Sequence, residues 1–215
     1  MTSTHAPSVR RPLVLVLALA LVAGALAGCI TVFPKETPVQ LYRFGYSPAG
    51  GAPSPSSSES TFTVRAVVAN FVRSSAGDRI LTMQGETVAY IGGARWVETA
   101  NTLMEDTVHA AFADRGPAAV VAKGELGPTD YRLTLAITTF EARYLQGRSA
   151  PPTVVVEINA ALDKTGDPTT RRERVFRAQS TAQANTVQSI VASFNAAVSD
   201  VLGQLVAWTN AKGGA

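Results

Sequence analysis

The pattern of apolar residues predicts an α+β fold, in which a mainly antiparallel sheet carries two amphipathic helices packed on one face. Several stretches alternate apolar and polar residues, as half-buried strands do. Two stretches, 99–114 and 186–208, carry apolar residues at helical spacing instead. The last three expected strands are joined by short connections, which favours an antiparallel meander.

The first 29 residues predict an export signal that ends in a lipid attachment site. Arg10 and Arg11 precede an apolar run that is too short for a spanning helix, which needs about 20 apolar residues. The run closes on Leu-Ala-Gly-Cys, which resembles the bacterial lipobox, and Cys29 is the only cysteine in the chain. That resemblance implies removal of residues 1–28 and attachment of acyl chains, such as palmitate, to the sulfur and new amino group of Cys29. An ordinary signal peptide with a chance cysteine is the alternative.

The anchor and the composition together limit the function classes. Each buried methylene contributes about 0.8 kcal/mol, and two acyl chains suffice for stable attachment to a membrane. Loss of residues 1–28 would leave 187 residues, with 17 basic against 16 acidic side chains. Near-neutrality argues against nucleic acid as a partner, because phosphate binding needs a basic surplus. With Cys29 acylated, no thiol is left for a disulfide.

The mature chain begins with a tether and a first strand. Residues 29–38 form the expected lipidated tether, and residues 39–210 form one domain. A strand is predicted at 39–44. Residues 47–60 consist almost wholly of Ser, Pro, Gly and Ala, so we expect a flexible surface insert within the domain.

Alternation continues in the middle of the chain. A strand is predicted from Thr61 to Val68, and a hairpin joins 79–84 to 87–90 across a Gly85-Glu86 turn. Gly92-Gly93 is expected to end the second hairpin strand before Trp96. A helix capped at Thr99 or Asn101 then extends to about residue 114.

The second half of the domain carries the longest strand patterns. A short strand is predicted at 118–122, followed by the three meander strands at 129–144, 154–162 and 171–182. The last element is the helix at 186–208, whose apolar stripe we expect to pack on the sheet. Pairing of this helix with a partner chain is a compatible alternative.

Candidate catalytic groups are few, and the sequence favours a protein that is not an enzyme. His109 is the only histidine after residue 28. Glu105, Asp106 and His109 have the spacing of a metal site on one helix face, but a solvated face is the favoured interpretation because a second histidine is missing. No Gly-x-Ser-x-Gly elbow occurs, and Gly92-Gly93 lacks phosphate-loop spacing. We therefore predict no catalytic, metal or cofactor residues.

Acidic and basic side chains on the meander complete the list of candidates. Glu157 and Asp163 alternate with core residues and are expected at the surface. Arg171, Arg172, Arg174 and Arg177 form the only basic cluster, interrupted by Glu173. A solvated rim is the default interpretation. Contact with anionic lipid is the alternative.

The order of these elements resembles the ABC-type transport auxiliary lipoproteins, which include the lipoprotein of the paraquat-inducible operon. The lipobox, the strand at 41–44, the strand at 62–68 and the hairpin match in that order. The most specific feature is Tyr90 placed shortly before Trp96 and the first helix. The insert at 47–60 and Gly92-Gly93 depart from the family pattern.

The resemblance implies a periplasmic lipoprotein that works beside an ABC transporter with a mammalian-cell-entry (MCE) domain protein. Such systems move lipids between the inner and outer membranes, and the lipoprotein would anchor or dock the conduit. Members of the family can assemble as homo-oligomeric rings. Because Ile30, and not Asp, follows Cys29, we expect anchoring on the periplasmic face of the outer membrane. A structural or assembly lipoprotein of the envelope, unrelated to transport, is the main alternative, and a lipid-anchored hydrolase that uses His109 is a weaker one.

Overall fold

The computed structural model describes residues 38–47, 61–113, 116–122 and 124–212. From Val39 onward these residues belong to one compact unit. Cys29, residues 29–37 of the predicted 29–38 tether and most of the 47–60 insert lie outside the described residues.

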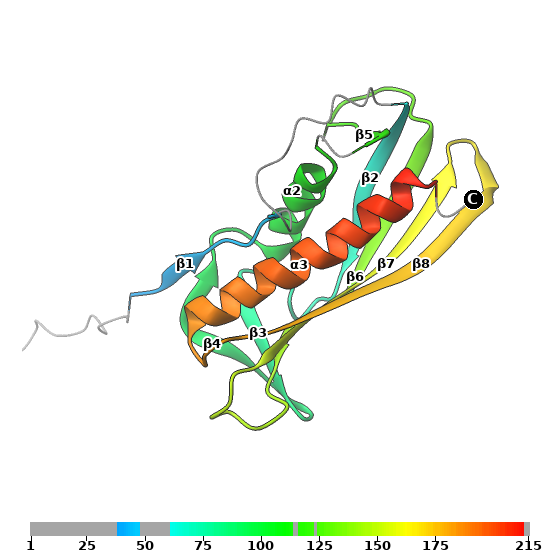
Figure 1. Ribbon diagram of the computed structural model, residues 1–215. Coiled ribbons are helices and arrows are strands. Elements are labelled where there is room, and N and C mark those ends of the chain that lie inside the picture. The colour runs from blue at the N-terminus through cyan, green and yellow to red at the C-terminus, as the bar shows by residue number, and fades with distance from the viewer. Residues whose placement is uncertain (1–37, 48–60, 114–115, 123, 213–215) are drawn as a thin grey trace, which may run out of the picture. The chain divides into compact units, whose positions relative to one another are not determined.

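Eight strands and two helices follow one another in the described part of the chain (Figure 1). They are β1 (Gln40–Tyr42), β2 (Phe62–Phe71), β3 (Arg79–Gln84), β4 (Thr87–Trp96), α2 (Ala100–Phe112), β5 (Ala118–Val120), β6 (Tyr131–Arg143), β7 (Thr153–Lys164), β8 (Asp167–Thr181) and α3 (Val187–Asn210). The elements follow one another in the predicted order, and the sheet carries both helices as predicted.

All eight strands form one sheet, with β6 at its centre. One edge of β6 pairs along its length with β7, and β7 pairs with β8, both antiparallel. The other edge of β6 is divided between two strands. β2 pairs in parallel with the first half of β6, up to Phe71↔Ile137, and β3 pairs in parallel with its end, at Thr82↔Ala142.

The prediction of a mainly antiparallel sheet is wrong, because the sheet is mixed. Four pairings are parallel, namely β1–β4, β2–β5, β2–β6 and β3–β6. Alternation of residues reports which face of a strand is buried, but not which strand lies beside it. Helix α2 carries the chain from β4 to β5, on the far side of β2, and β6 then inserts between β2 and β3. Such crossovers return the chain in the same direction and so create parallel neighbours.

The glycine pair in β4 does not end the strand, contrary to expectation. The strand continues through Gly92 and Gly93 to Trp96. Gly93 has φ of +68°, a left-handed conformation that side chains other than glycine adopt at a cost. The register between β3 and β4 shifts in this region, between Arg79 and Leu81. The pair therefore marks an irregularity inside a strand. The predicted Gly85 turn is correct, with φ of +56°.

Both helices begin where the sequence predicts. The Thr99 hydroxyl accepts from the Thr102 N–H at 3.2 Å, and the Thr186 hydroxyl accepts from the Ser189 N–H at 3.3 Å. Each threonine thereby satisfies a donor that the first helical turn leaves without an intrahelical partner.

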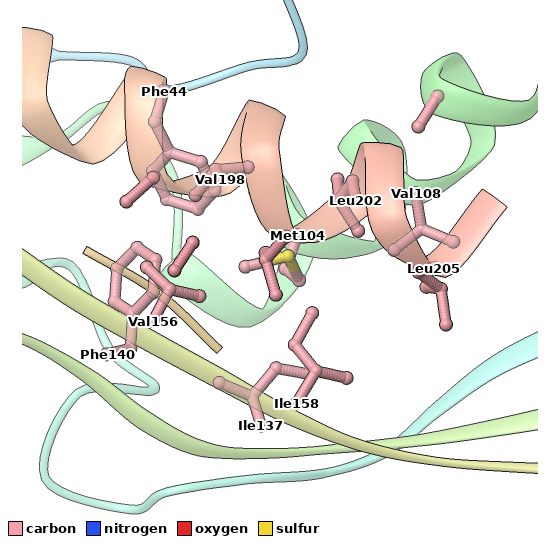
Figure 2. Packing of buried hydrophobic residues seen from close by; sticks show 14 of the residues in the cluster. Phe44, Met104, Val108, Ile137, Phe140, Val156, Ile158, Val198, Leu202 and Leu205 are labelled. Atoms are coloured by element: carbon pink, nitrogen blue, oxygen red, sulfur yellow. The ribbon is translucent and has the colours of Figure 1, made fainter. Parts of the chain in front are cut away.

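The two helices pack on one face of the sheet and enclose the core (Figure 1). Figure 2 shows Val198 and Leu202 of α3 above Phe140 and Val156 of the sheet, with Met104 of α2 between the layers. All five side chains are nearly inaccessible to solvent. Burial of this apolar surface is the main source of stability.

Helix α3 is the one described helix that is long and apolar enough to cross a membrane, judged by length and composition alone. Twelve of its residues are instead buried in the domain, and ten of these are apolar, among them Phe194 and Trp208. The length and hydropathy of α3 are thus explained by its place over the meander.

Candidate functional site

Three surface regions of the described residues could bind a partner. They are a groove beside α2, a trough on the face of the sheet that no helix covers, and the arginine cluster of β8. Cys29, the predicted lipidation site, lies outside the described residues, so its acylation stays a prediction.

The groove lies between α2, the free side of β2 and the chain that leaves β5. It has a volume of about 200 Å³. Its lining residues are Arg65, Ala66, Val67 and Val68 from β2, Glu105, Val108 and His109 from α2, and Val121, Ala122 and Gly124. Strand β5 pairs with β2 only as far as Val64, so β2 has one strand neighbour beyond that point in the described chain.

Charged side chains at the groove have structural partners. The Arg65 guanidinium donates to the carbonyls of Glu125 at 2.9 Å and Gly127 at 2.7 Å, which holds the loop after β5 against β2. The Glu105 carboxylate accepts from the Asn101 amide at 3.2 Å. The Arg65 and Glu105 side chains therefore line the groove and are also held in place by hydrogen bonds within the fold.

The structure places the metal candidates of the sequence on α2. Glu105 and His109 are half-buried at the groove, whereas Asp106 is exposed. Among the residues that the structure describes, no three acidic, histidine or cysteine side chains come together as a metal site would require. The lining of the groove combines apolar side chains with a few polar ones, a combination typical of binding sites.

The arginine cluster of β8 is divided between the two faces of the sheet. Arg171 contacts Asp163 at 3.4 Å and Glu173 at 2.6 Å, and Arg177 contacts Glu157 at 3.6 Å. Hydrogen bonding to Glu173, and the charges of Glu173 and Asp163, raise the pKa of Arg171, so it is always charged. The predicted surface carboxylates Glu157 and Asp163 are therefore the ion-pair partners of two of these arginines.

The other two arginines point to the helix side of β8. Arg172 and Arg174 are aligned with the buried Leu162 and Ala160 of β7. The Arg174 guanidinium lies 5.2 Å from the centre of the Phe176 ring, a cation–π contact. The sequence run of arginines is thus no single basic patch, because successive strand residues face opposite ways.

The trough lies on the face of the sheet that no helix covers. It has a volume of about 360 Å³, and its lining includes the small side chains of Ala69, Ala136 and Ala161. Arg171, Glu173 and Val175 line it on the β8 side. Sequence reasoning missed both the groove and the trough, because each depends on which strands are neighbours.

A comparison with protein families decides the class of the chain. The family described as "ABC-type transport auxiliary lipoprotein component" matches residues 48–206, which is most of the chain. The chain belongs to this family. The resemblance predicted from the strand order and the Tyr90–Trp96 spacing is therefore confirmed.

Solved structures similar to this auxiliary lipoprotein share its fold. Protein XCC0632 from Xanthomonas campestris, of family DUF330, is 24% identical, with a TM-score of 0.69 over 81% of this chain and 97% of that one. An uncharacterized protein is 15% identical, with a TM-score of 0.55 over 80% and 99%. A PelC variant from Paraburkholderia phytofirmans, a dodecamer, is 14% identical over 69% and 90%, and its TM-score of 0.37 is too low for any inference. No curated protein matches.

Proposed function

We propose that this auxiliary lipoprotein is a non-enzymatic component of an ABC transport system whose substrate-binding subunit carries an MCE domain. The system would move lipids between the inner and outer membranes, and this chain would anchor or dock the conduit. The observation that carries the proposal is the family match over residues 48–206. An auxiliary component contributes by its position, so the paucity of catalytic groups in the sequence fits this role.

The proposed anchor is the acylated Cys29. Three acyl chains would hold the domain on a leaflet essentially permanently, since two already suffice for stable attachment. Ile30 in place of Asp supports the periplasmic face of the outer membrane as the location. A component that bridges two membranes needs one end fixed to the far membrane, which agrees with this location.

The surface of the domain suits contact with protein partners. The groove and the trough are lined by both apolar and polar side chains, while the β8 arginines Arg171 and Arg177 are compensated by neighbouring carboxylates. Among the described residues, this compensation breaks up the basic stripe that nucleic acid binding would need. We therefore assign the partners to the membrane, the MCE-domain protein and further copies of this chain in a ring.

Co-purification of the mature acylated chain tests the proposal. The tagged chain, solubilised from membranes in mild detergent, should carry an MCE-domain protein with it. The Cys29→Ala variant should fold but leave the membrane fraction, because the described core begins well after residue 29. A clean preparation of the acylated chain without any MCE-domain protein would contradict the proposal.

The alternative is a structural or assembly lipoprotein of the envelope that has no part in transport. The genes next to this one separate the two functions. Adjacent permease, ATPase and MCE-domain genes favour transport, and envelope-assembly genes in their place favour the alternative. Loss of a hydrolytic activity on His109→Ala would instead point to an enzyme.

A further inference from the structure

Exposed apolar side chains gather at the β1 edge of the sheet. Val39, Leu41 and Val97 are 47%, 61% and 46% exposed, which makes them three of the eight large apolar side chains that the described chain leaves exposed. Single exposed apolar residues are normal, but a group of them marks an interaction surface.

The ladder between β1 and β4 places these side chains on one face. Leu41 is aligned with Arg95, and the Val97 N–H donates to the Tyr42 carbonyl at 2.7 Å, which extends the ladder by one step. Side chains two residues apart on a strand share a face. Val39, Leu41, Arg95 and Val97 therefore lie on the face opposite the buried Trp96, which is the face without helices.

Basic side chains accompany the apolar ones. Arg43 is exposed and follows Leu41 by two residues, and Arg95 is half exposed and pairs with Asp78 at 2.8 Å. We call Val39, Leu41, Arg43, Arg95 and Val97 the β1 patch. Apolar side chains that enter the interface, together with arginines that reach the lipid headgroups, are the composition of a membrane-surface contact.

The predicted anchor limits how far this patch can move from a bilayer. Nine residues, 30–38, separate Cys29 from Val39. A fully extended chain spans about 3.3–3.6 Å per residue, so Val39 stays within about 35 Å of the lipid surface. The β1 patch begins at Val39 itself, whereas β8 forms the opposite edge of the sheet (Figure 1).

We propose that the β1 patch is a lipid-contact surface that seats the domain on the bilayer holding its own acyl anchor. This inference rests on the acylation of Cys29 in the proposed function, and it adds the orientation of the domain. Leu41 and Val97 enter the interface, Arg43 contacts anionic headgroups, and β8, at the opposite edge of the sheet, lies farther from that bilayer.

Site-directed fluorescence tests the orientation on the mature acylated chain. Acylation blocks the native thiol, so a cysteine introduced by Leu41→Cys is the one site for an environment-sensitive label. Leu126→Cys and Val175→Cys are matched controls, since these side chains are 97% and 59% exposed and lie outside the patch. The chains are reconstituted on vesicles of phosphatidylethanolamine and phosphatidylglycerol, with and without nitroxide-labelled lipid.

The expected result is a blue shift and strong quenching by nitroxide lipid at position 41, with at least several-fold weaker quenching at positions 126 and 175. A second substitution, Val97→Asp, should reduce the quenching at position 41 while the chain stays on the vesicles. Quenching at position 41 no greater than at position 126 would overturn the proposal. So would a signal at position 41 that follows protein density but not nitroxide lipid, because the patch would then contact another copy.

Failure of the anchor gives a different result from failure of the orientation. A chain that does not stay on vesicles lacks the acyl anchor, and both the β1-patch inference and the anchor in the proposed function are then wrong. A chain that stays on vesicles, but whose label at position 41 remains in water, contradicts the β1-patch inference alone. Co-purification with the MCE-domain protein is independent of both outcomes.

Discussion

The two halves of the sheet are built differently. In the meander half, β6, β7 and β8 are 13, 12 and 15 residues long and pair over nearly their full lengths under α3. In the other half, β1 and β5 have three residues each, and β2 and β3 share one edge of β6. The meander half is held by neighbours in sequence, whereas the other half, apart from the β3–β4 hairpin, is held by contacts between segments far apart in the chain.

A cluster of aromatic rings joins the two halves. Phe140 of β6 has its ring centre 5.0 Å from that of Phe44, 5.4 Å from Phe71 and 4.8 Å from Phe194. Trp96 lies against Phe44 at 5.0 Å and Phe194 at 5.3 Å, both edge to face. Aromatic pairs in these geometries add to the stability that burial alone provides. The comparison predicts that the halves unfold together as long as this cluster is intact.

The largest expected effect comes from Phe140→Ala, which removes the ring that contacts both halves. Truncation of a fully buried Phe costs about 3–5 kcal/mol. Urea unfolding followed by tryptophan fluorescence measures the loss, and Leu126→Ala at a nearly fully exposed position is the control. A loss as small as that of the control would contradict a role for this ring in joining the halves.

A smaller effect is expected from the irregular part of β4. Gly93→Ala places a side chain at a left-handed backbone position and should cost about 1–2 kcal/mol. Gly92→Ala is a matched control, since its φ is not left-handed and open space surrounds the added carbon. Equal unfolding midpoints for the two variants would contradict the backbone assignment. The difference in unfolding free energy between the two variants measures the cost of a side chain at this left-handed position of β4, which lies in the half of the sheet with irregular strands.

The smallest expected effect comes from an exposed clamp, the pair of hydrogen bonds that joins Thr63 of β2 to Asp130 immediately before β6. Hydrogen bonds from the Thr63 N–H at 2.7 Å and the Thr63 hydroxyl at 2.9 Å lower the pKa of Asp130 below its ordinary 3.8. A lowered pKa in the folded state stabilises the fold above about pH 4, and this contribution disappears as the pH falls through the folded-state pKa.

The Asp130→Asn variant tests this clamp. The variant keeps an oxygen that accepts from Thr63, but it cannot titrate. Its urea midpoint should therefore fall less between pH 7 and pH 3 than that of the unchanged chain. Asp106→Asn, at an exposed position of α2, is the control. Identical pH profiles for the Asp130 variant and the unchanged chain would exclude a role for the clamp.

Local patterns predicted the meander half well and the other half only in part. Alternation placed β6, β7 and β8, and short connections between them made antiparallel pairing the expected result. The same alternation in β2 could not reveal that its neighbours are β5 and β6, because the chain reaches both through long connections. The prediction that Gly92-Gly93 ends a strand was wrong for a related reason, because glycine occurs both at strand ends and at irregular positions inside strands.

Local sequence patterns also predicted the surface features only in part. The groove at Arg65 and His109 exists because β5 ends at Val120 and leaves one side of β2 open. No residue pattern within β2 or α2 indicates that this side of β2 lacks a strand neighbour in the described chain. The division of the β8 arginines could have been predicted, because residues at odd and even positions of a strand face opposite ways. Their partners, Glu157 and Asp163, depend on the register with β7, which the sequence pattern leaves open.

Strand β8 is 15 residues long and forms an outer edge of the sheet, with β7 as its one strand neighbour in the described chain. An outer strand of this length invites a strand from a neighbouring molecule to add to it, which leads to aggregation. Arg171, Arg172, Arg174 and Arg177 place charge on both sides of that strand, and Pro168 removes one backbone donor near its start. The arginines that look like a binding site in the sequence are thus of the kind that disfavours unspecific strand addition at an exposed edge.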